Sequence, residues 1–267
     1  MARAATHIPD SDASTRLVDY EQPLSERMRT FMRLEFLYQQ LLYNCELEAD
    51  WATRAAISGL LDIMAILTRG DLRSEVYKAL DRQVEALQRY KDEPQVDTRR
   101  LDTLVRTLVD SRRDIDAIGP QFLQSIKDSE FLSAIKHRSS IPGGACEFDL
   151  PVYSHWLRQP YERRQQDIAE WMNSIRPLCD AVVELLWLTR ETAHPVRKLA
   201  INGMYQYNVQ KGANCRLLRV SLPEGSPLYP EISGSQHRFI IRFLEWSSTD
   251  RRAAQTGHDV SFQLSIS

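Results

Sequence analysis

The chain lacks long hydrophobic runs, and this shortage limits what it can be. No apolar stretch in its 267 residues approaches the roughly 20 residues that a membrane-spanning helix needs. The N-terminal segment up to Tyr20 is polar and has no apolar core of the signal-peptide kind. These features predict a soluble cytoplasmic protein whose residues 1–20 form a disordered extension.

Cysteine is scarce and scattered. The four cysteines are Cys45, Cys146, Cys179 and Cys215, and no two of them form a C-x-x-C pair. Such wide spacing disfavours a zinc cluster and, in a cytoplasmic protein, structural disulfides. The six histidines likewise show no ligand spacing. We therefore expect no metal site and no cofactor.

Recognised catalytic motifs are missing as well. The chain contains no G-x-S-x-G, no P-loop, no G-x-G-x-x-G and no H-E-x-x-H. Its one partial match, S-x-x-K from Ser133 to Lys136, lacks the companion motifs that give this pattern meaning. The sequence therefore favours a protein that is not an enzyme, and a hydrolase or transferase with an unusual site is the weaker alternative.

The first two thirds of the chain carry apolar side chains mainly at helical spacing. Asp71 and Asp97 are suited to cap the starts of two of the helices, and Gly70 is suited to end another. Short connections between successive helices predict antiparallel neighbours in a bundle. The expected helices cover about 24–45, 49–68, 72–91, 97–113, 121–137 and, in two pieces separated near Pro177, 161–192.

The last quarter alternates with the period of β-strands. Helices followed by strands predict an α+β fold, with an N-terminal helical bundle domain and an antiparallel β-sheet domain. We assign residues 21–115 with 160–193 to the helical domain, and 116–159 with 194–267 to the β domain. The expected strands cover 199–209, 217–222, 237–246 and 260–266, with an edge strand over 147–153.

The most informative strand is the one over 237–246. Because successive side chains of a strand point to opposite faces, Phe239, Ile241 and Phe243 would form the core face. Arg238 and Arg242 would share the other face with Ile240 and Leu244, and the two arginines would lie about 13 Å apart. Such a face suits an acidic and partly apolar partner such as a peptide. Cross-strand pairing of the two arginines with acids is the alternative.

Charge is unevenly distributed along the chain. From Pro195 onward, nine Lys/Arg stand against five Asp/Glu, although the whole chain has a net charge of −2. The basic surplus therefore coincides with the strands and favours an acidic partner there. Arg251 and Arg252 are most simply solvated loop residues, and Trp156 and Trp171 are expected to pack in the interior.

Several stretches together resemble the ZapD family of cell division proteins. They occur in order over residues 23–243, almost the whole chain, and the SIPGG signature at 140–144 is the most distinctive. The matching stretches are 23–37 (PLSERMRTFMRLEFL), 140–144 (SIPGG), 148–151 (FDLP), Trp156, 202–203 (NG), 205–206 (YQ), 228–230 (LYP), 232–234 (ISG), 238–239 (RF) and 241–243 (IRF).

The resemblance implies a non-enzymatic partner of FtsZ, the bacterial tubulin homologue. Members of this family are homodimers with a helical domain and a β domain. They bind the C-terminal tail of FtsZ in a basic pocket, and they crosslink and bundle its filaments at the midcell division ring. That tail combines acidic, basic and apolar residues, which agrees with the expected face around Ile240.

The family's basic pocket carries over to this chain in part. Arg33, Arg69, Arg238 and Arg242 match its positions, and together with Ile240 they form the predicted partner-binding site. Two positions depart, since Glu130 stands where the family carries arginine and Ser154 where it carries histidine. Lys127 and His155 lie nearby in the sequence. On an extended backbone, His155 would point away from the position of Ser154.

The expected function is therefore FtsZ-tail binding by a cytoplasmic homodimer that is recruited to midcell, without nucleic acid or membrane as partners. The alternative is a nucleic-acid-binding module that uses the same basic β face. Against it, the chain is slightly acidic overall, has no dense Lys/Arg tract and lacks a recognised reader motif.

Overall fold

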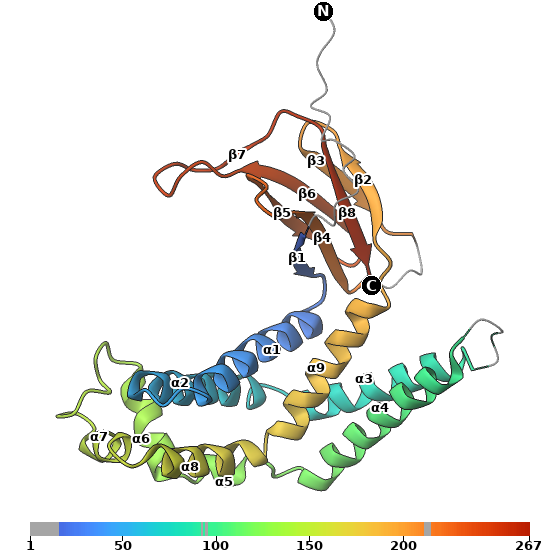
Figure 1. The fold of residues 1–267 in the computed structure, drawn as a ribbon. Helices are drawn as coiled ribbons and strands as arrows, with labels where there is room; N and C mark the ends of the chain where they lie inside the picture. The colour runs from blue at the N-terminus through green and yellow to red at the C-terminus, as the bar shows by residue number, and fades with distance from the viewer. Residues whose placement is uncertain (1–15, 92, 94–95, 211–214) are drawn as a thin grey trace, which may run out of the picture. The chain divides into compact units, whose positions relative to one another are not determined.

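The computed structural model describes residues 16–91, 93, 96–210 and 215–267, and its chain divides into two compact units (Figure 1). The β unit comprises the residues up to Arg29 together with Leu188–Ser267, and the helical unit comprises Thr30–Trp187. The structure confirms the expected α+β class, because most helices precede the strands and every strand pairing is antiparallel.

The helices follow the apolar periodicity of the sequence. Asp71 accepts a hydrogen bond from the Ser74 amide at 3.2 Å, and Asp97 accepts from the amides of Arg99 and Arg100, so both predicted caps are confirmed. The helices are α1 (Glu26–Cys45), α2 (Asp50–Leu67), α3 (Leu72–Gln88), α4 (Thr98–Ile118), α5 (Gln124–Lys127), α6 (Glu130–Ser139), α7 (Pro151–Leu157), α8 (Tyr161–Asn173) and α9 (Arg176–Glu191).

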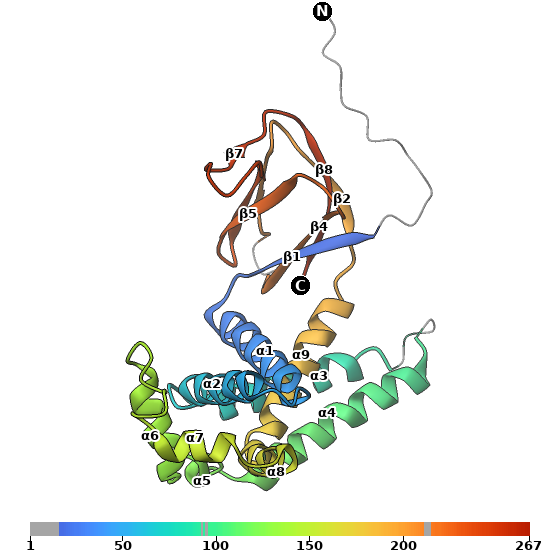
Figure 2. The same ribbon diagram turned by 60° about the vertical axis from the view of Figure 1, so that its left-hand side comes forward.

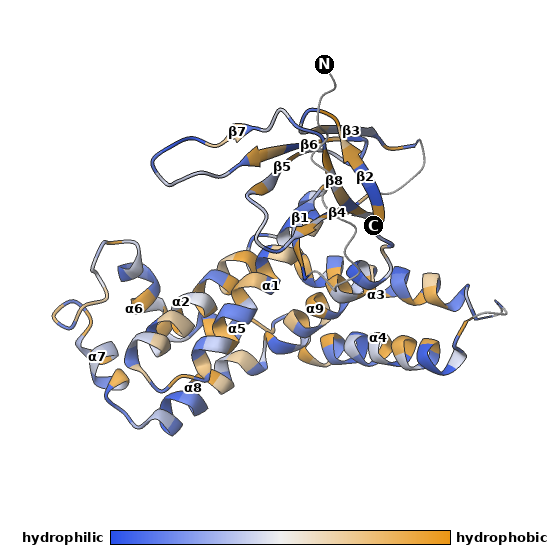
Figure 3. Cartoon of the chain, turned by 45° about the horizontal axis from the view of Figure 1, so that its top comes forward, coloured by the Kyte–Doolittle hydropathy of each residue, from blue (hydrophilic) through white to orange (hydrophobic). Residues whose placement is uncertain are grey.

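The core of the helical unit is formed by the apolar stripes of these amphipathic helices. Figure 3 shows hydrophobic and hydrophilic residues interleaved along α4, as expected for a helix with one buried face. Trp156 and Trp171 pack with Phe131 and Tyr153 in an aromatic cluster, as expected, but both tryptophans are only partly buried. The indole of Trp156 donates to Asp167 at 2.8 Å, so its polar atom is also satisfied.

Residues 140–157 form the expected turn followed by a helix, and the helix stands in place of an expected edge strand. Ile141-Pro142-Gly143-Gly144 forms a turn in which the Gly144 amide donates to the Ile141 carbonyl at 2.9 Å and Gly143 has φ +74°. The edge strand expected over 147–153 is wrong, because Pro151 begins α7. Proline has no amide hydrogen and therefore interrupts a strand. It fits the first turn of a helix, where the backbone amides have no acceptor within the helix.

The domain boundaries also differ from the predicted ones. Residues 116–159, which we expected in the β domain, are helices and turns that belong to the helical unit. That unit begins at Thr30 rather than at 21. Residues 1–15 of the expected disordered extension lie outside the described residues, whereas Leu17–Pro23 forms strand β1.

The β unit consists of two antiparallel sheets that share one core. The first sheet has the order β1-β4-β8-β2, and the second has the order β3-β6-β5 with β7 paired to one end of β6. Phe243 of the second sheet contacts Phe262 of the first at a ring-centroid distance of 5.0 Å, inside a single buried cluster. The strands are β1, β2 (Val196–Ala200), β3 (Met204–Asn208), β4 (Leu217–Pro223), β5 (Leu228–Gly234), β6 (Arg238–Glu245), β7 (Ala254–Gln255) and β8 (Val260–Ile266).

The four strands predicted in the last quarter are present, but the first of them is split. Asn202 and Gly203 both have positive φ and divide the expected strand over 199–209 into β2 and β3, which lie in different sheets. Two residues with positive φ are the signature of a tight hairpin turn, for which Asn-Gly is the preferred sequence. The prediction missed β5 and β7.

Ion pairs that were not predicted from the sequence hold strand β1 at the edge of the first sheet. The strand runs beside β4 (Figure 2), with Glu21 opposite Arg219. The Glu21 carboxylate accepts hydrogen bonds from Arg219 and from Arg190 near the end of α9, at 2.9–3.2 Å. Charge-assisted hydrogen bonds are stronger than neutral ones. These bonds therefore stabilise the packing of β1 within the β unit.

No single described helix is long and apolar enough to cross a membrane. Only α2 and α3 taken together, which meet at 79°, reach the length and composition of a span.

Arg164 gives a first prediction, for the stability of the helical unit. Its guanidinium, on a residue only 4% exposed, donates to Asp50, Thr53 and the Glu48 carbonyl at 2.7–2.9 Å. We expect Arg164→Leu to lower the free energy of unfolding by about 2–3 kcal/mol, because the buried Thr53 hydroxyl loses its donor and the hydrogen bonds to Asp50 and to the Glu48 carbonyl are lost. Urea unfolding followed by helical circular dichroism measures this loss.

Arg163 provides the matched control. Its exposed guanidinium pairs with Asp167 of the same helix at 3.1 Å, and an ion pair whose cation stays in solvent contributes about 0–1 kcal/mol. Equal losses from Arg163→Leu and Arg164→Leu would contradict the role that we give to the buried guanidinium.

Cys215 gives a prediction for pH. Burial raises the pKa of its thiol from 9.0 to about 11. The unfolded chain therefore ionises first, so the contribution of the neutral thiol is complete below about pH 9 and is lost as pH rises toward 11. We expect the urea midpoint of the wild type to fall more over this range than that of Cys215→Ala. Parallel pH profiles for the two proteins would refute this assignment.

Candidate functional site

Strand β6 is the centre of the candidate site. It pairs with β3 on one side and with β5 on the other, so its backbone is held by both neighbours. Phe239, Ile241 and Phe243 are 0–1% exposed, which confirms the predicted core face. On the opposite side, Arg238 and Arg242 are exposed, and Ile240 is partly buried between them.

Neighbouring strands extend this side of β6 into a surface. In an antiparallel sheet, directly paired residues lie on the same face. Arg242 is flanked by Met204 and Glu231, and Ile240 is flanked by Gln206 and Ser233. We call this surface the outer β6 face, and it consists of Met204, Gln206, Asn208, Tyr229, Glu231, Ser233, Arg238, Ile240, Arg242 and Leu244.

The two arginines of the outer β6 face are in different electrostatic states. Arg242 forms an ion pair with Glu231 on β5, so its charge is already balanced within the sheet. Arg238 is exposed and forms no ion pair with any residue that the structure describes. The alternative of cross-strand pairing therefore holds for Arg242 and fails for Arg238. Arg238 is left to attract an acidic ligand.

A shallow pocket adjoins Arg242 at one end of this face. Its volume is about 350 Å³, and it extends from β5 across β6 to the segment that leads into β7. Arg252 lines this pocket together with Arg242, whereas the sequence pattern predicts only a solvated loop residue at 252. The residues lining it are Tyr229, Glu231, Arg242, Leu244, Arg252, Ala253 and Gln255.

The other two predicted residues, Arg33 and Arg69, belong to the helical unit. Arg33 is exposed on α1, one helical turn before Phe36, whose exposed fraction of 67% is high for an aromatic side chain. Arg69 is exposed directly after α2. The structure therefore places Arg238, Ile240 and Arg242 on one strand and assigns the two remaining arginines to another unit.

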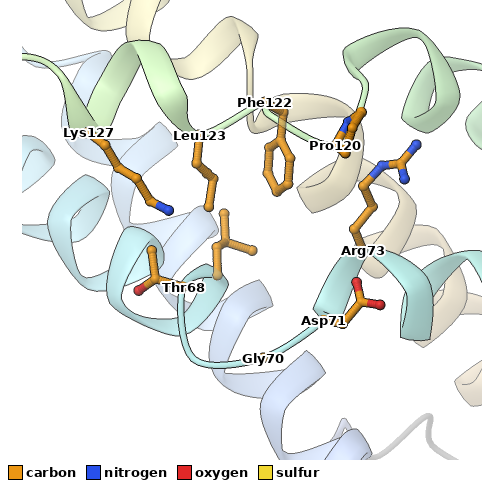
Figure 4. A pocket seen from close by; sticks show the side chains of 9 residues that line it. Thr68, Gly70, Asp71, Arg73, Pro120, Phe122, Leu123 and Lys127 are labelled. Atoms are coloured by element: carbon orange, nitrogen blue, oxygen red, sulfur yellow. The ribbon is translucent and has the colours of Figure 1, made fainter.

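Arg69 adjoins a small pocket in the helical unit. The pocket has a volume of about 250 Å³, and in Figure 4 Lys127 and Arg73 stand at its opposite ends. The sequence alone shows Lys127 only as a cation near the departing position Glu130. The residues lining this pocket are Leu67, Thr68, Gly70, Asp71, Arg73, Pro120, Phe122, Leu123 and Lys127.

The two positions that depart from the family pattern are now located. Glu130 is exposed at the first position of α6, after the capping residue Ser129. Ser154 is only 7% exposed within α7, whereas His155 is exposed. The expected extended backbone is wrong here, but a helix also separates adjacent side chains, by about 100°. His155 thus does not take the place of a histidine at 154.

The chemistry available at these sites is that of binding. Guanidinium groups are permanently charged and donate planar pairs of hydrogen bonds, so they suit carboxylates. Within the described residues, no three His, Cys, Asp or Glu side chains are grouped as a metal site would require.

Comparisons with known proteins agree on one family. The family model ZapD, described as a cell division protein, matches residues 32–242. A protein of Methylococcus capsulatus named cell division protein ZapD is 36% identical over 247 residues, covering 92% of this chain and 96% of its own length. The protein of the same name from Yersinia enterocolitica is 38% identical over 234 residues, or 88% and 92% of the two chains. That of Pectobacterium carotovorum is 36% identical over 238 residues, or 89% and 93%.

The two adjacent isoleucines of β6 give a direct test of the face assignment. Ile241 is 0% exposed, whereas Ile240 lies on the outer β6 face. We expect Ile241→Ala to lower the free energy of unfolding by about 3 kcal/mol, and Ile240→Ala by about 1 kcal/mol or less. Urea unfolding of the two variants measures the difference, and similar losses would show that the faces are assigned wrongly.

Proposed function

The chain belongs to the ZapD family of cell division proteins, and from this membership we propose that it binds the C-terminal tail of FtsZ and, as a homodimer, crosslinks FtsZ filaments. The observation that carries the proposal is the outer β6 face, where an exposed Arg238, paired with no acid among the described residues, lies on the same strand as Ile240 and Arg242. This combination of cations with an apolar centre matches a short tail of mixed acidic and apolar residues.

Binding at this face has identifiable steps. A tail carboxylate is attracted first to Arg238, whose charge no described residue balances. An apolar tail residue then covers the partly exposed Ile240. A further carboxylate takes a place beside Arg242, where it competes with Glu231 for the guanidinium. The family resemblance also implies partner-binding roles for Arg33 and Arg69, which belong to the helical unit.

The expected affinity of one site for one tail is low. Exposed ion pairs contribute about 0–1 kcal/mol each, which leads to affinities of roughly micromolar strength at best. A filament, however, displays many tails, and a dimer offers two sites to them. Linking two weak sites in this way raises the overall affinity by about 10²–10⁴. Weak single contacts are therefore compatible with firm but reversible bundling of filaments.

This function needs no catalysis. The relatives are named for cell division, and their names specify no reaction. We propose that the protein acts in the cytoplasm as a non-enzymatic crosslinker and that its binding to FtsZ recruits it to midcell.

A nucleic-acid-binding module remains the second candidate, because the outer β6 face is also suited to phosphates. The Arg242–Glu231 pair weakens this alternative, since it places a carboxylate in the middle of the face. A peptide with alternating charges accommodates such an acid more readily than a phosphate backbone does, because every phosphate carries negative charge.

The proposed function predicts salt-sensitive peptide binding that depends on Arg238. We expect a fluorescent FtsZ C-terminal peptide to bind the wild type and to bind Arg238→Glu about tenfold more weakly, because attraction becomes repulsion. The double variant Arg238→Glu/Arg242→Glu should show no binding while it stays folded and dimeric. Binding should also weaken as salt rises, since screening is stronger at higher ionic strength.

Arg197→Glu is the control for this experiment. Arg197 is exposed on β2, in the other sheet, so the variant makes the same change of charge away from the outer β6 face. The proposal would be refuted if the folded wild type did not bind the peptide. It would also be refuted if Arg197→Glu and Arg238→Glu weakened peptide binding equally. Displacement of the peptide by a short oligonucleotide at lower concentration than by unlabelled peptide would favour the nucleic-acid alternative.

A further inference from the structure

The pocket beside Arg242 combines cationic and apolar side chains. Three segments of the chain line it. Among the lining residues are two arginines, Arg242 and Arg252, and two large, mainly apolar residues, Tyr229 and Leu244. Tyr229 and Leu244 are direct cross-strand partners, and both are partly buried. They form an apolar floor between the strands, with the cations beside it.

The charge balance of this pocket depends on Arg252. Arg242 and Glu231 neutralise each other through their ion pair, in which both side chains are about half exposed. Arg252 is exposed and has no ion pair with any residue in the described part of the chain. The net positive charge of the pocket therefore comes from Arg252, which lies on the segment between β6 and β7 (Figure 1).

This arrangement selects one kind of ligand. An exposed guanidinium beside an apolar floor fits a peptide in which a carboxylate follows or precedes an apolar side chain. Residues 238 and 242 are about 13 Å apart along β6. An extended peptide that contacts both Arg238 and this pocket therefore needs acidic groups at least about four residues apart.

We propose that Arg252 binds a carboxylate of the partner peptide in this pocket, and that Glu231 competes with the same peptide for Arg242. Arg252 is thus a specificity-determining residue outside the set predicted from the sequence. This inference rests on the proposed function, because its ligand is the acidic peptide that the outer β6 face binds.

Arg251 makes the test sharp. It is adjacent to Arg252, is also exposed and carries the same charge, but it does not line the pocket. A general effect of net charge would therefore change binding equally in variants of the two residues. A specific contact in the pocket would change it only in variants of Arg252.

The experiment measures binding of a fluorescent FtsZ C-terminal peptide to full-length protein by anisotropy at low salt. We expect Arg252→Gln to weaken binding roughly fivefold and Arg251→Gln to weaken it less than twofold. Glu231→Gln should tighten binding roughly threefold, because Arg242 loses its internal partner. Circular dichroism establishes that each variant is folded.

Peptides in which single carboxylates are replaced by amides identify the contact. For one such peptide, Arg252→Gln should have no further effect, since the interaction is already absent. Equal effects of the variants at Arg251 and Arg252, or an undiminished effect of Arg252→Gln with every amide peptide, would overturn the assignment of Arg252. If Glu231→Gln bound the peptide with unchanged affinity, the proposed competition between Glu231 and the peptide for Arg242 would be refuted.

These outcomes separate the two proposals. Suppose that Arg238→Glu loses peptide binding while Arg251→Gln and Arg252→Gln have equal effects on peptide affinity. This result would refute the role of the pocket but would still support the proposed function. Absence of peptide binding by the folded wild type would overturn both.

Discussion

The two-residue period of strand β6 is the constraint on which the candidate site depends. Phe239, Ile241 and Phe243 bury their side chains between the two sheets, and burial of large apolar side chains is the main favourable contribution to folding. Because the period of a strand is fixed, this burial also determines that Arg238 and Arg242 face outward. A shift of the strand by one residue would place both guanidinium groups in the core. The outer β6 face is thus as strongly determined as the core itself.

The neighbouring strands decide what the outward arginines can do. Glu231 on β5 balances Arg242, so the two arginines of the sequence motif are not equivalent. Arg252 restores a positive charge beside that pair, although it is ten residues further along the chain. The surface therefore presents separated positive charges with apolar residues between them, rather than a continuous basic strip. Such a pattern favours a peptide of mixed composition over a uniformly charged polymer.

The two units contribute in different ways to the proposed role in cell division. The β unit carries the outer β6 face, and its N-terminal strand is fastened through Glu21 to Arg190 and Arg219. The helical unit carries Arg33 and Arg69, and its own stability depends on contacts such as those of the buried Arg164. In the proposed function, weak exposed ion pairs are sufficient, because avidity for many tails rather than single-site affinity would hold the assembly.

The sequence by itself determined the features that rest on local periodicity and on capping. These are the major helices, the helix starts at Asp71 and Asp97, the four C-terminal strands and the two faces of β6. Its resemblance to the ZapD family extended over most of the chain and indicated the arginines of the candidate site. The tertiary structure alone decided which distant residues meet. Contacts between separate segments decide the pairing of β1 with β4, the Arg242–Glu231 pair and the place of Arg252 in the pocket. A choice between two local structures decides that α7 is a helix. Proline at 151 is compatible with either a strand end or a helix start, and only packing distinguishes them.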